Sequence, residues 1–280
     1  MLFGINTFLW ASAFGAEQFE LLPSIREHGF DGVELPLLRP SEFKSAAIRR
    51  ALTENGLGCT TCSVVPSGLS LISDEAAVRR KTISYVTECI TCTAEAGGTL
   101  MVGPLYSPVG YLPGRRRNAD EWKRAVEGYQ ELGPVLQEHG VHVAIEPLNR
   151  FETYFLNTTA DAVQLCAEIA HPNVGILWDT FHANIEEKNI AEALRLTGRF
   201  LKHVHTCEND RGTPGTGHVD WTGVFAALRD LRYDGWLTIE SFGFALGDIA
   251  AAASIWRDLA PTPEEIAWKG VEFLKASLKN

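Results

Sequence analysis

The chain has 280 residues, of which 35 are acidic and 25 basic, so its formal net charge is −10 with histidine neutral. This acidic balance offers no basic surface for a phosphate backbone, and 21% charged residues leave no apolar run long enough to span a bilayer. We therefore expect no nucleic-acid partner and no membrane span. The first twenty residues are apolar, but no Lys or Arg precedes Arg26, so they predict a buried strand of a cytoplasmic protein rather than a secretory signal.

Short apolar segments alternate along the chain with longer stretches of helical periodicity. The predicted strands are Leu2–Asn6, Gly32–Leu35, Leu57–Val65, Thr99–Gly103, His142–Glu146, Val174–Asp179, Phe200–His205 and Leu237–Glu240. The predicted helices are Gln18–His28, Ser41–Asn55, Asp74–Ala96, Ala119–His139, Thr159–Ile169, Ile190–Thr197, Trp221–Leu231 and Pro263–Leu278.

Eight strand–helix units without an intervening linker predict an α/β fold in which parallel strands close into a (β/α)8 TIM barrel. We expect this barrel to occupy residues 1–280 as a single domain. A doubly wound open sheet is the alternative. It normally carries a Gly-rich phosphate turn after its first strand, and residues 6–10 (NTFLW) contain no such turn.

Polar side chains stand at the ends of the last four predicted strands. Three are carboxylates and one is an imidazole: Glu146, Asp179, His205 and Glu240. Function in a TIM barrel is located where the strands end, and carboxylates packed there repel one another unless a positive charge lies among them. Three oxygen ligands and one nitrogen ligand predict a divalent cation, with Mn²⁺ or Mg²⁺ favoured and Co²⁺ as a further option.

The seventh strand offers two imidazoles for this site. His203 and His205 are two residues apart, so both lie on the same face of the strand. We predict His205 as the ligand because it lies nearer the mouth of the barrel. His203 is expected one layer deeper, hydrogen-bonded to its neighbours.

Three segments near these strand ends resemble the D-tagatose 3-epimerase family of xylose-isomerase-like barrels, which includes D-psicose (D-allulose) 3-epimerases and L-ribulose 3-epimerases. They are residues 144–154 (AIEPLNRFETY), 177–187 (LWDTFHANIEE) and 203–215 (HVHTCENDRGTPG). The resemblance implies that Glu146, Asp179, His205 and Glu240 bind the metal, usually Mn²⁺ or Co²⁺. It further implies that Glu152, His182 and Arg211 contact the oxygens of the sugar, and that the chain forms a homodimer or homotetramer.

The chemistry expected from this resemblance is epimerisation of a free ketose at carbon 3. One of Glu146 and Glu240 removes the proton and the other returns it, while a cation stabilises the enediolate between the two steps. An aldose–ketose or hydroxypyruvate-type isomerase on the same barrel is the alternative. A barrel that binds metal and sugar without turnover is a third hypothesis, and the presence of both glutamates argues against it.

The remaining pocket is predicted from the loops after the early strands and after the eighth. Candidate wall residues are Asn6, Cys62, Tyr106 and Phe242, and Val109 stands where several members of the family have a Trp. The loop of residues 241–245 (SFGFA) has only one Gly, so it lacks the backbone cradle that barrels use for phosphate. A free sugar is therefore the expected substrate.

Overall fold

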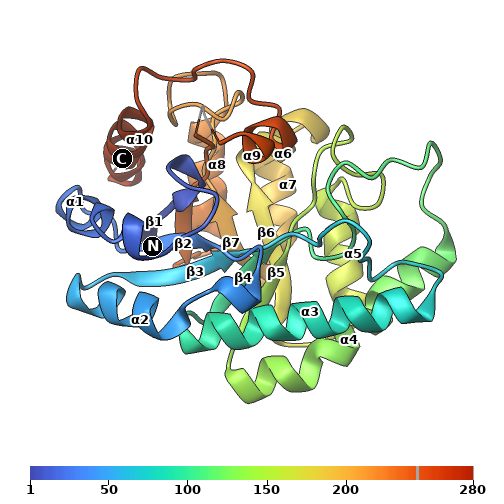
Figure 1. Cartoon of the computed structure of the whole chain (residues 1–280). Helices are drawn as coiled ribbons and strands as arrows, with labels where there is room; N and C mark the ends of the chain where they lie inside the picture. Colours follow the sequence, from blue (N-terminus) through green and yellow to red (C-terminus); the bar gives the residue numbers. More distant parts are fainter. Residues whose placement is uncertain (244–245, 280) are drawn as a thin grey trace.

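Parallel strands form a closed barrel in the computed structural model, which describes residues 1–243 and 246–279 (Figure 1). Within this described part the eight strands are β1 (Leu2–Asn6), β2 (Gly32–Pro36), β3 (Gly58–Cys62), β4 (Leu100–Gly103), β5 (His142–Ile145), β6 (Val174–Asp179), β7 (Leu201–His205) and β8 (Trp236–Ile239). Each strand pairs with the next, and β8 pairs with β1, so the sheet has no free edge. The predicted TIM barrel is confirmed.

Helices surround this barrel, and α3 and α4 lie side by side along one flank (Figure 1). Those in the described residues are α1 (Leu21–Glu27), α2 (Ser45–Glu54), α3 (Ala76–Glu95), α4 (Ala119–His139), α5 (Thr159–Ile169), α6 (Thr180–Glu186), α7 (Ile190–Thr197), α8 (Trp221–Asp230), α9 (Asp248–Ala252) and α10 (Pro263–Leu278). None of the helices described is long and apolar enough to cross a membrane.

Local sequence signals explain where the helices begin and end. The α4 helix begins with a capping box, in which Asn118 and Glu121 each accept a hydrogen bond from the other's backbone N–H, and ends at Gly140 with a φ of 63°. Sequence periodicity did not predict α6 and α9, because helices of seven and five residues are too short to show a repeat. The predicted β3 is also too long, since its ladder ends at Cys62.

Alternate strand residues separate into two apolar clusters. A large cluster between the strands and the helices includes Ile145 and Val204, whereas a small cluster inside the barrel includes Leu100, Ala144 and Leu177. Because side chains alternate with a period of two, a residue two positions beyond an inward residue also points inward. Side chains at the ends of β5 and β6 that stand two positions beyond Ala144 and Leu177 therefore also point into the barrel.

Candidate active site

The four strand-end side chains predicted to bind a cation lie together at the mouth of the barrel. Glu146 and Asp179 are two residues beyond the inward-facing Ala144 and Leu177, and His205 and Glu240 complete the group from β7 and the end of β8. All four are buried, and one ligand atom from each lies within 4.8 Å of the others. The parallel register of β5 to β8 is what brings these distant residues to one place.

The imidazole of His205 has two different environments at its two nitrogens. Nε2 lies 2.7 Å from Oε1 of Glu34, and because a carboxylate only accepts, Nε2–H is the donor. Nδ1 faces Asp179, Glu240 and Glu146 at 3.5, 3.4 and 3.9 Å, and it has no hydrogen-bond partner among the residues described. An unpartnered buried nitrogen aimed at three carboxylates fits a divalent cation of borderline hardness.

The buried charges shift the pKa values of this group in opposite directions. Burial and the neighbouring Glu240 raise the pKa of Glu146 well above its ordinary value. Burial would also raise the pKa of Asp179, but the guanidinium of Arg211 holds it well below its ordinary value. Like charges therefore crowd the site, and Arg211 compensates only part of the negative charge.

Arg211 reaches these carboxylates from the loop that follows β7. Its Nη1 donates to Oδ2 of Asp179 at 2.9 Å and to Oε2 of Glu240 at 2.5 Å, and the side chain is buried. The guanidinium also stacks over the ring of Phe181, with its carbon 4.1 Å from the ring centroid. Its backbone has a φ of 67°, in the left-handed region that non-glycine residues rarely adopt. The loop must therefore be held firmly.

Glu208 is the residue that holds this loop, and the sequence analysis did not identify it. Its buried carboxylate accepts hydrogen bonds from the backbone N–H groups of Gly215 and Val219 at 2.8 and 3.0 Å, and from Nε1 of Trp221 at 2.9 Å. These bonds close the segment between β7 and α8 around one point. A charged residue three positions before Arg211 was visible in the sequence, but its partners were not.

His182 and Glu152 lie beside the carboxylate group. His182 is on α6, which Asp179 caps by accepting from the N–H of Phe181 at 2.6 Å. Its Nε2 is 3.5 Å from Oε1 of Glu146, its Nδ1 accepts from the backbone N–H of Asn149, and burial lowers its pKa to about 3. Burial raises the pKa of Glu152, which accepts from the amide of Asn149 at 2.7 Å. Asn149, another residue that sequence reasoning missed, thus links the two.

A cavity of about 130 Å³ opens beside these side chains. Five residues predicted to bind the metal or the sugar line this cavity: Glu146, Glu152, His182, Arg211 and Glu240. Two of the predicted wall residues, Cys62 and Phe242, line it as well. Val109 also lines it. The predicted wall residues Asn6 and Tyr106 do not line the cavity. The side-chain amide of Asn6 donates to Glu34, and the hydroxyl of Tyr106 donates to the backbone oxygen of Glu146. Phe244 and Ala245 of the eighth loop lie outside the described residues.

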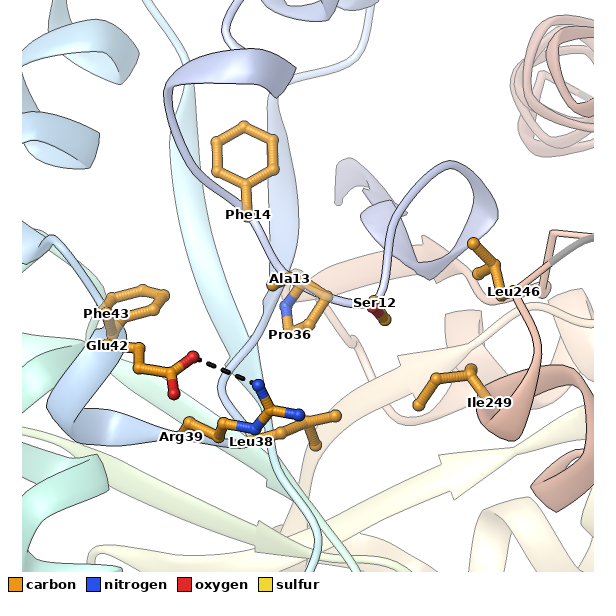
Figure 2. Close-up of a pocket in the computed structure, with 10 residues that line it drawn as sticks. All are labelled: Ser12, Ala13, Phe14, Pro36, Leu38, Arg39, Glu42, Phe43, Leu246 and Ile249. Carbon is orange, nitrogen blue, oxygen red and sulfur yellow. Dashed lines mark hydrogen bonds and ion pairs between the residues drawn. The ribbon is translucent and has the colours of Figure 1, made fainter.

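A second cavity of about 230 Å³ adjoins the first and shares Leu38 and Ile249 with it. Figure 2 shows Phe43 on one side of it and Ile249 on the other, with the polar residues Ser12, Arg39 and Glu42 also in its wall. Among the described residues that line it, the one carboxylate belongs to Glu42, which is paired with Arg39 at 3.2 Å. The chemistry-bearing residues therefore belong to the smaller cavity.

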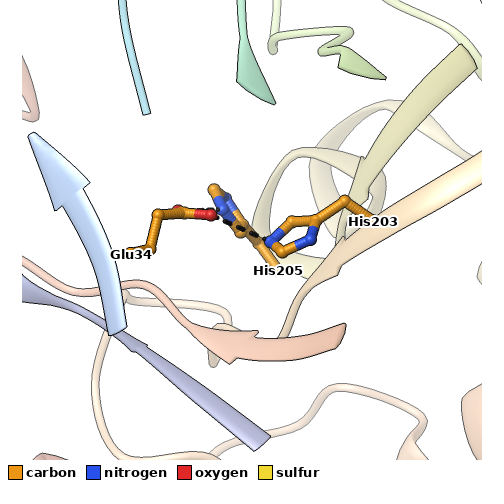
Figure 3. Close-up of side chains that lie close together, drawn as sticks. All are labelled: Glu34, His203 and His205. Atoms are coloured by element: carbon orange, nitrogen blue, oxygen red, sulfur yellow. Dashed lines mark hydrogen bonds and ion pairs between the residues drawn. The ribbon is translucent and has the colours of Figure 1, made fainter. Parts of the chain in front are cut away.

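A buried acid in the middle of β2 is the largest omission of the sequence analysis. Glu34 lies inside the barrel beside His203 and His205, at 3.0 and 2.7 Å from their Nε2 atoms (Figure 3). His203 precedes His205 by two positions on β7 and therefore lies one layer deeper, but neither of its ring nitrogens has a hydrogen-bond partner among the described residues, so the predicted hydrogen bonds are not found. A carboxylate at an inward position of the apolar strand Gly32–Pro36 is a signal that could have identified Glu34.

Comparison with known families agrees with this architecture. Residues 22–277 match the family described as xylose isomerase-like TIM barrel. The chain belongs to this family. The resemblance to it that the sequence motifs carried is confirmed.

Individual relatives narrow the comparison. The chain is 34% identical to a probable ketose 3-epimerase of Synechocystis sp., over 98% of this chain and 95% of that protein. It is 32% identical to a D-psicose 3-epimerase of Agrobacterium fabrum, over 93% and 91% of the two chains. A D-allulose 3-epimerase from Methylomonas sp., solved in complex with D-allulose, superposes with a TM-score of 0.93 at 27% identity over 99% and 97% of the chains. These relatives are isomerase-class enzymes that act on sugars.

Proposed function

We propose that this barrel domain is a metal-dependent ketose 3-epimerase that acts on free ketoses. The observation that carries the proposal is the group of four inward-facing ligands, in which Nδ1 of His205 faces three carboxylates and has no hydrogen-bond partner in the described part of the chain. The names of the relatives, and the ketose bound in one solved relative, support a small sugar as substrate.

Glu146, Asp179, His205 and Glu240 would hold the cation. We propose Mn²⁺, with Co²⁺ and Mg²⁺ as the ions to compare, because hard oxygen ligands with a single imidazole suit these ions better than thiolate-preferring ones. When bound, the cation supplies stabilisation of the negative charge that develops on the sugar oxygens as a proton leaves carbon 3.

Glu146 and Glu240 exchange the proton at carbon 3. Both line the cavity, and they come from β5 and β8, so a sugar lying between them presents one face to each. One carboxylate removes the proton, and the other returns a proton from the opposite side, which inverts the carbon. The bound epimer decides which glutamate acts first.

Glu152, His182 and Arg211 orient the sugar in this proposal. All three line the cavity, and so do the apolar side chains Phe8, Leu38 and Phe242. A ketose has hydroxyl groups to pair with the first set and carbon faces to pack on the second. Exclusion of water by this wall strengthens every charge interaction inside the site.

Deuterium exchange tests the proposal. Purified protein with Mn²⁺ and D-fructose, D-tagatose or L-ribulose in deuterated water should place deuterium at carbon 3. Glu146→Gln and Glu240→Gln should reduce this exchange by about 10²-fold or more, because each removes an acid–base group. Glu42→Gln, in the adjoining cavity, is the matched control and should keep full exchange.

Other labelling patterns would point to other functions. Label at the carbon next to carbon 3 would favour the aldose–ketose or hydroxypyruvate-type isomerase. Absence of label with every ketose, together with sugar binding that both glutamine variants retain, would favour the binding module. Either result would overturn the epimerase.

We also propose that the chain forms a homodimer or homotetramer. Large apolar side chains are exposed in the loops after β4 and β5, with Tyr111 at 55%, Leu112 at 48% and Phe151 at 70% exposure. Such residues commonly mark an interaction surface. Sedimentation equilibrium should give two or four chains per particle, and a monomer at every concentration would contradict this proposal.

A further inference from the structure

We propose that Glu34 is a positioning residue, which holds His205 so that Nδ1 is directed at the cation site. The inference rests on the proposed metal centre. It extends that centre to a residue that contacts neither the sugar nor the carboxylate oxygens proposed to bind the cation. Glu34 does not line the cavity, and it reaches the site directly through His205 and indirectly through Asn6, whose Nδ2 donates to both Glu34 and Glu240.

The contact between the two residues crosses the interior of the barrel. Glu34 is on β2 and His205 on β7, and these strands are not neighbours in the sheet. Oε1 of Glu34 nevertheless lies 2.7 Å from Nε2 of His205, and neither side chain has any exposed surface (Figure 3). Strand pairing alone does not require this contact, so it is a property of the side chains.

Glu34 is itself firmly anchored. Oε1 accepts from Nδ2 of Asn6 at 2.9 Å, and Oε2 accepts from Oγ1 of Thr60 at 2.8 Å. Nε2 of His203 lies 3.0 Å from Oε2. Each oxygen is therefore held by a hydrogen bond, one from β1 and one from β3, and the carboxylate offers His205 one fixed acceptor.

This fixed acceptor determines which nitrogen of His205 is free to bind a cation. The carboxylate can only accept, so the hydrogen of a neutral imidazole resides on Nε2 and the lone pair remains on Nδ1. The same contact opposes a half-turn of the imidazole ring about χ2. Without it, such a rotation would exchange the positions of Nδ1 and Cδ2 at small torsional cost. A carboxylate that orients a metal-binding histidine in this way usually contributes 10–100-fold to metal affinity.

A purely structural role for Glu34 predicts different behaviour. If the residue only joined the strands inside the barrel, its replacement would lower stability and leave the affinity of the folded protein for metal unchanged. The test must therefore measure the metal site and the ring, in addition to activity. It compares the full-length wild-type chain with Glu34→Gln, and with Glu121→Gln as a control that replaces another buried glutamate, one that does not line the cavity.

Two measurements distinguish the roles. Mn²⁺ affinity of the folded protein, measured by electron paramagnetic resonance, should fall about 10–100-fold in Glu34→Gln and remain within twofold in the control. With ¹⁵N-labelled histidine and Zn²⁺ as a diamagnetic probe, the wild type should show zinc on Nδ1 and hydrogen on Nε2 of His205. At the same Zn²⁺ concentration, Glu34→Gln should show a smaller fraction of His205 in this form, and the metal-free rings should have hydrogen on either nitrogen. Saturating Mn²⁺ should restore most of the epimerase activity of this variant, because Glu34 does not touch the sugar.

Each other outcome identifies which hypothesis fails. If the wild type binds no divalent cation, the proposed metal centre fails, and this inference fails with it. If the wild type binds Mn²⁺ and Glu34→Gln binds it equally with the same hydrogen position, only the role of Glu34 is overturned. If Glu34→Gln does not fold, Thr60→Val removes one anchor and leaves the carboxylate. Unchanged affinity and an unchanged ring in that variant would also overturn the inference.

Discussion

Removal of the Arg211 guanidinium should destabilise the metal-free protein strongly. Arg211→Met keeps the length of the side chain and the left-handed backbone but removes the partner that donates to Asp179 and Glu240. Both carboxylates are buried and would then share their site with no opposing arginine. The variant isolates the charge because methionine can still pack against Phe181.

The magnitude follows from burial. Breaking a buried ion pair by removing one partner costs about 3–5 kcal/mol, because the remaining charge keeps its desolvation penalty. The entropy of unfolding is about 2.1 cal/mol/K per residue, so for a chain of 280 residues this cost lowers Tm by about 5–9 °C. Saturating Mn²⁺ should reduce the difference, because a cation would then compensate the same carboxylates.

Thermal unfolding of the wild type and the variant, with chelator and with Mn²⁺, measures both effects. The matched control is Arg195→Met, which breaks the surface pair of Arg195 with Asp230 and should leave Tm nearly unchanged, because an exposed ion pair contributes little to stability. Equal Tm values for Arg211→Met and the control in chelator would refute the argument from buried charge. A deficit in Arg211→Met that Mn²⁺ leaves unchanged would refute the compensation by a cation.

Three further predictions concern the pocket, the barrel and the charge on α4. Val109→Trp should narrow the cavity that Val109 lines. The kcat/KM for L-ribulose divided by the kcat/KM for D-fructose should then rise by about 10-fold or more. An unchanged ratio would mean that the distal carbons of the sugar do not lie beside Val109. Gly103→Ala should lower stability toward urea by about 2–4 kcal/mol, because Gly103 has a φ of 128° and a Cβ there would collide with the backbone carbonyl that follows β3. Gly140→Ala, where φ is positive but space is open, should cost less, and equal losses would contradict the collision. Burial would raise the pKa of Glu121, but its bond to Arg115 holds it below the ordinary 4.5. The wild type should therefore be more stable than Glu121→Gln at pH values above 4.5, and this advantage should disappear as the pH falls through the lowered pKa of Glu121. Midpoints of urea unfolding that differ between the two proteins equally at pH 7 and below pH 4 would contradict this prediction.

The candidate site could be predicted from the sequence to the extent that it depends on strand periodicity. Glu146, Asp179, His205 and Glu240 each follow an apolar strand segment, and a period of two places each on the inward face. Periodicity does not report depth or what lies behind a residue. For this reason Tyr106 was expected in the wall of the cavity, whereas it lies beneath the backbone of Glu146.

Contacts between strands that are not neighbours were beyond the sequence. Glu34 and His205 are 171 residues apart, and no pattern in either strand identifies the other as its partner. The same limit applies to Asn149, in the loop after β5, and His182, on α6, which meet only when the barrel has closed. Glu208 was visible as a charged loop residue, but the N–H groups that it binds are known only from the folded loop.

The sequence by itself determined the alternation of strands and helices, the closed α/β barrel and the acids at the strand ends, because these depend on local patterns of apolar and polar residues. Tertiary structure decided which atoms of those acids meet, which nitrogen of His205 faces them, and how far Arg211 compensates their charge. Those properties depend on distances of a few ångströms between segments remote in the chain. Only closure of the barrel defines such distances.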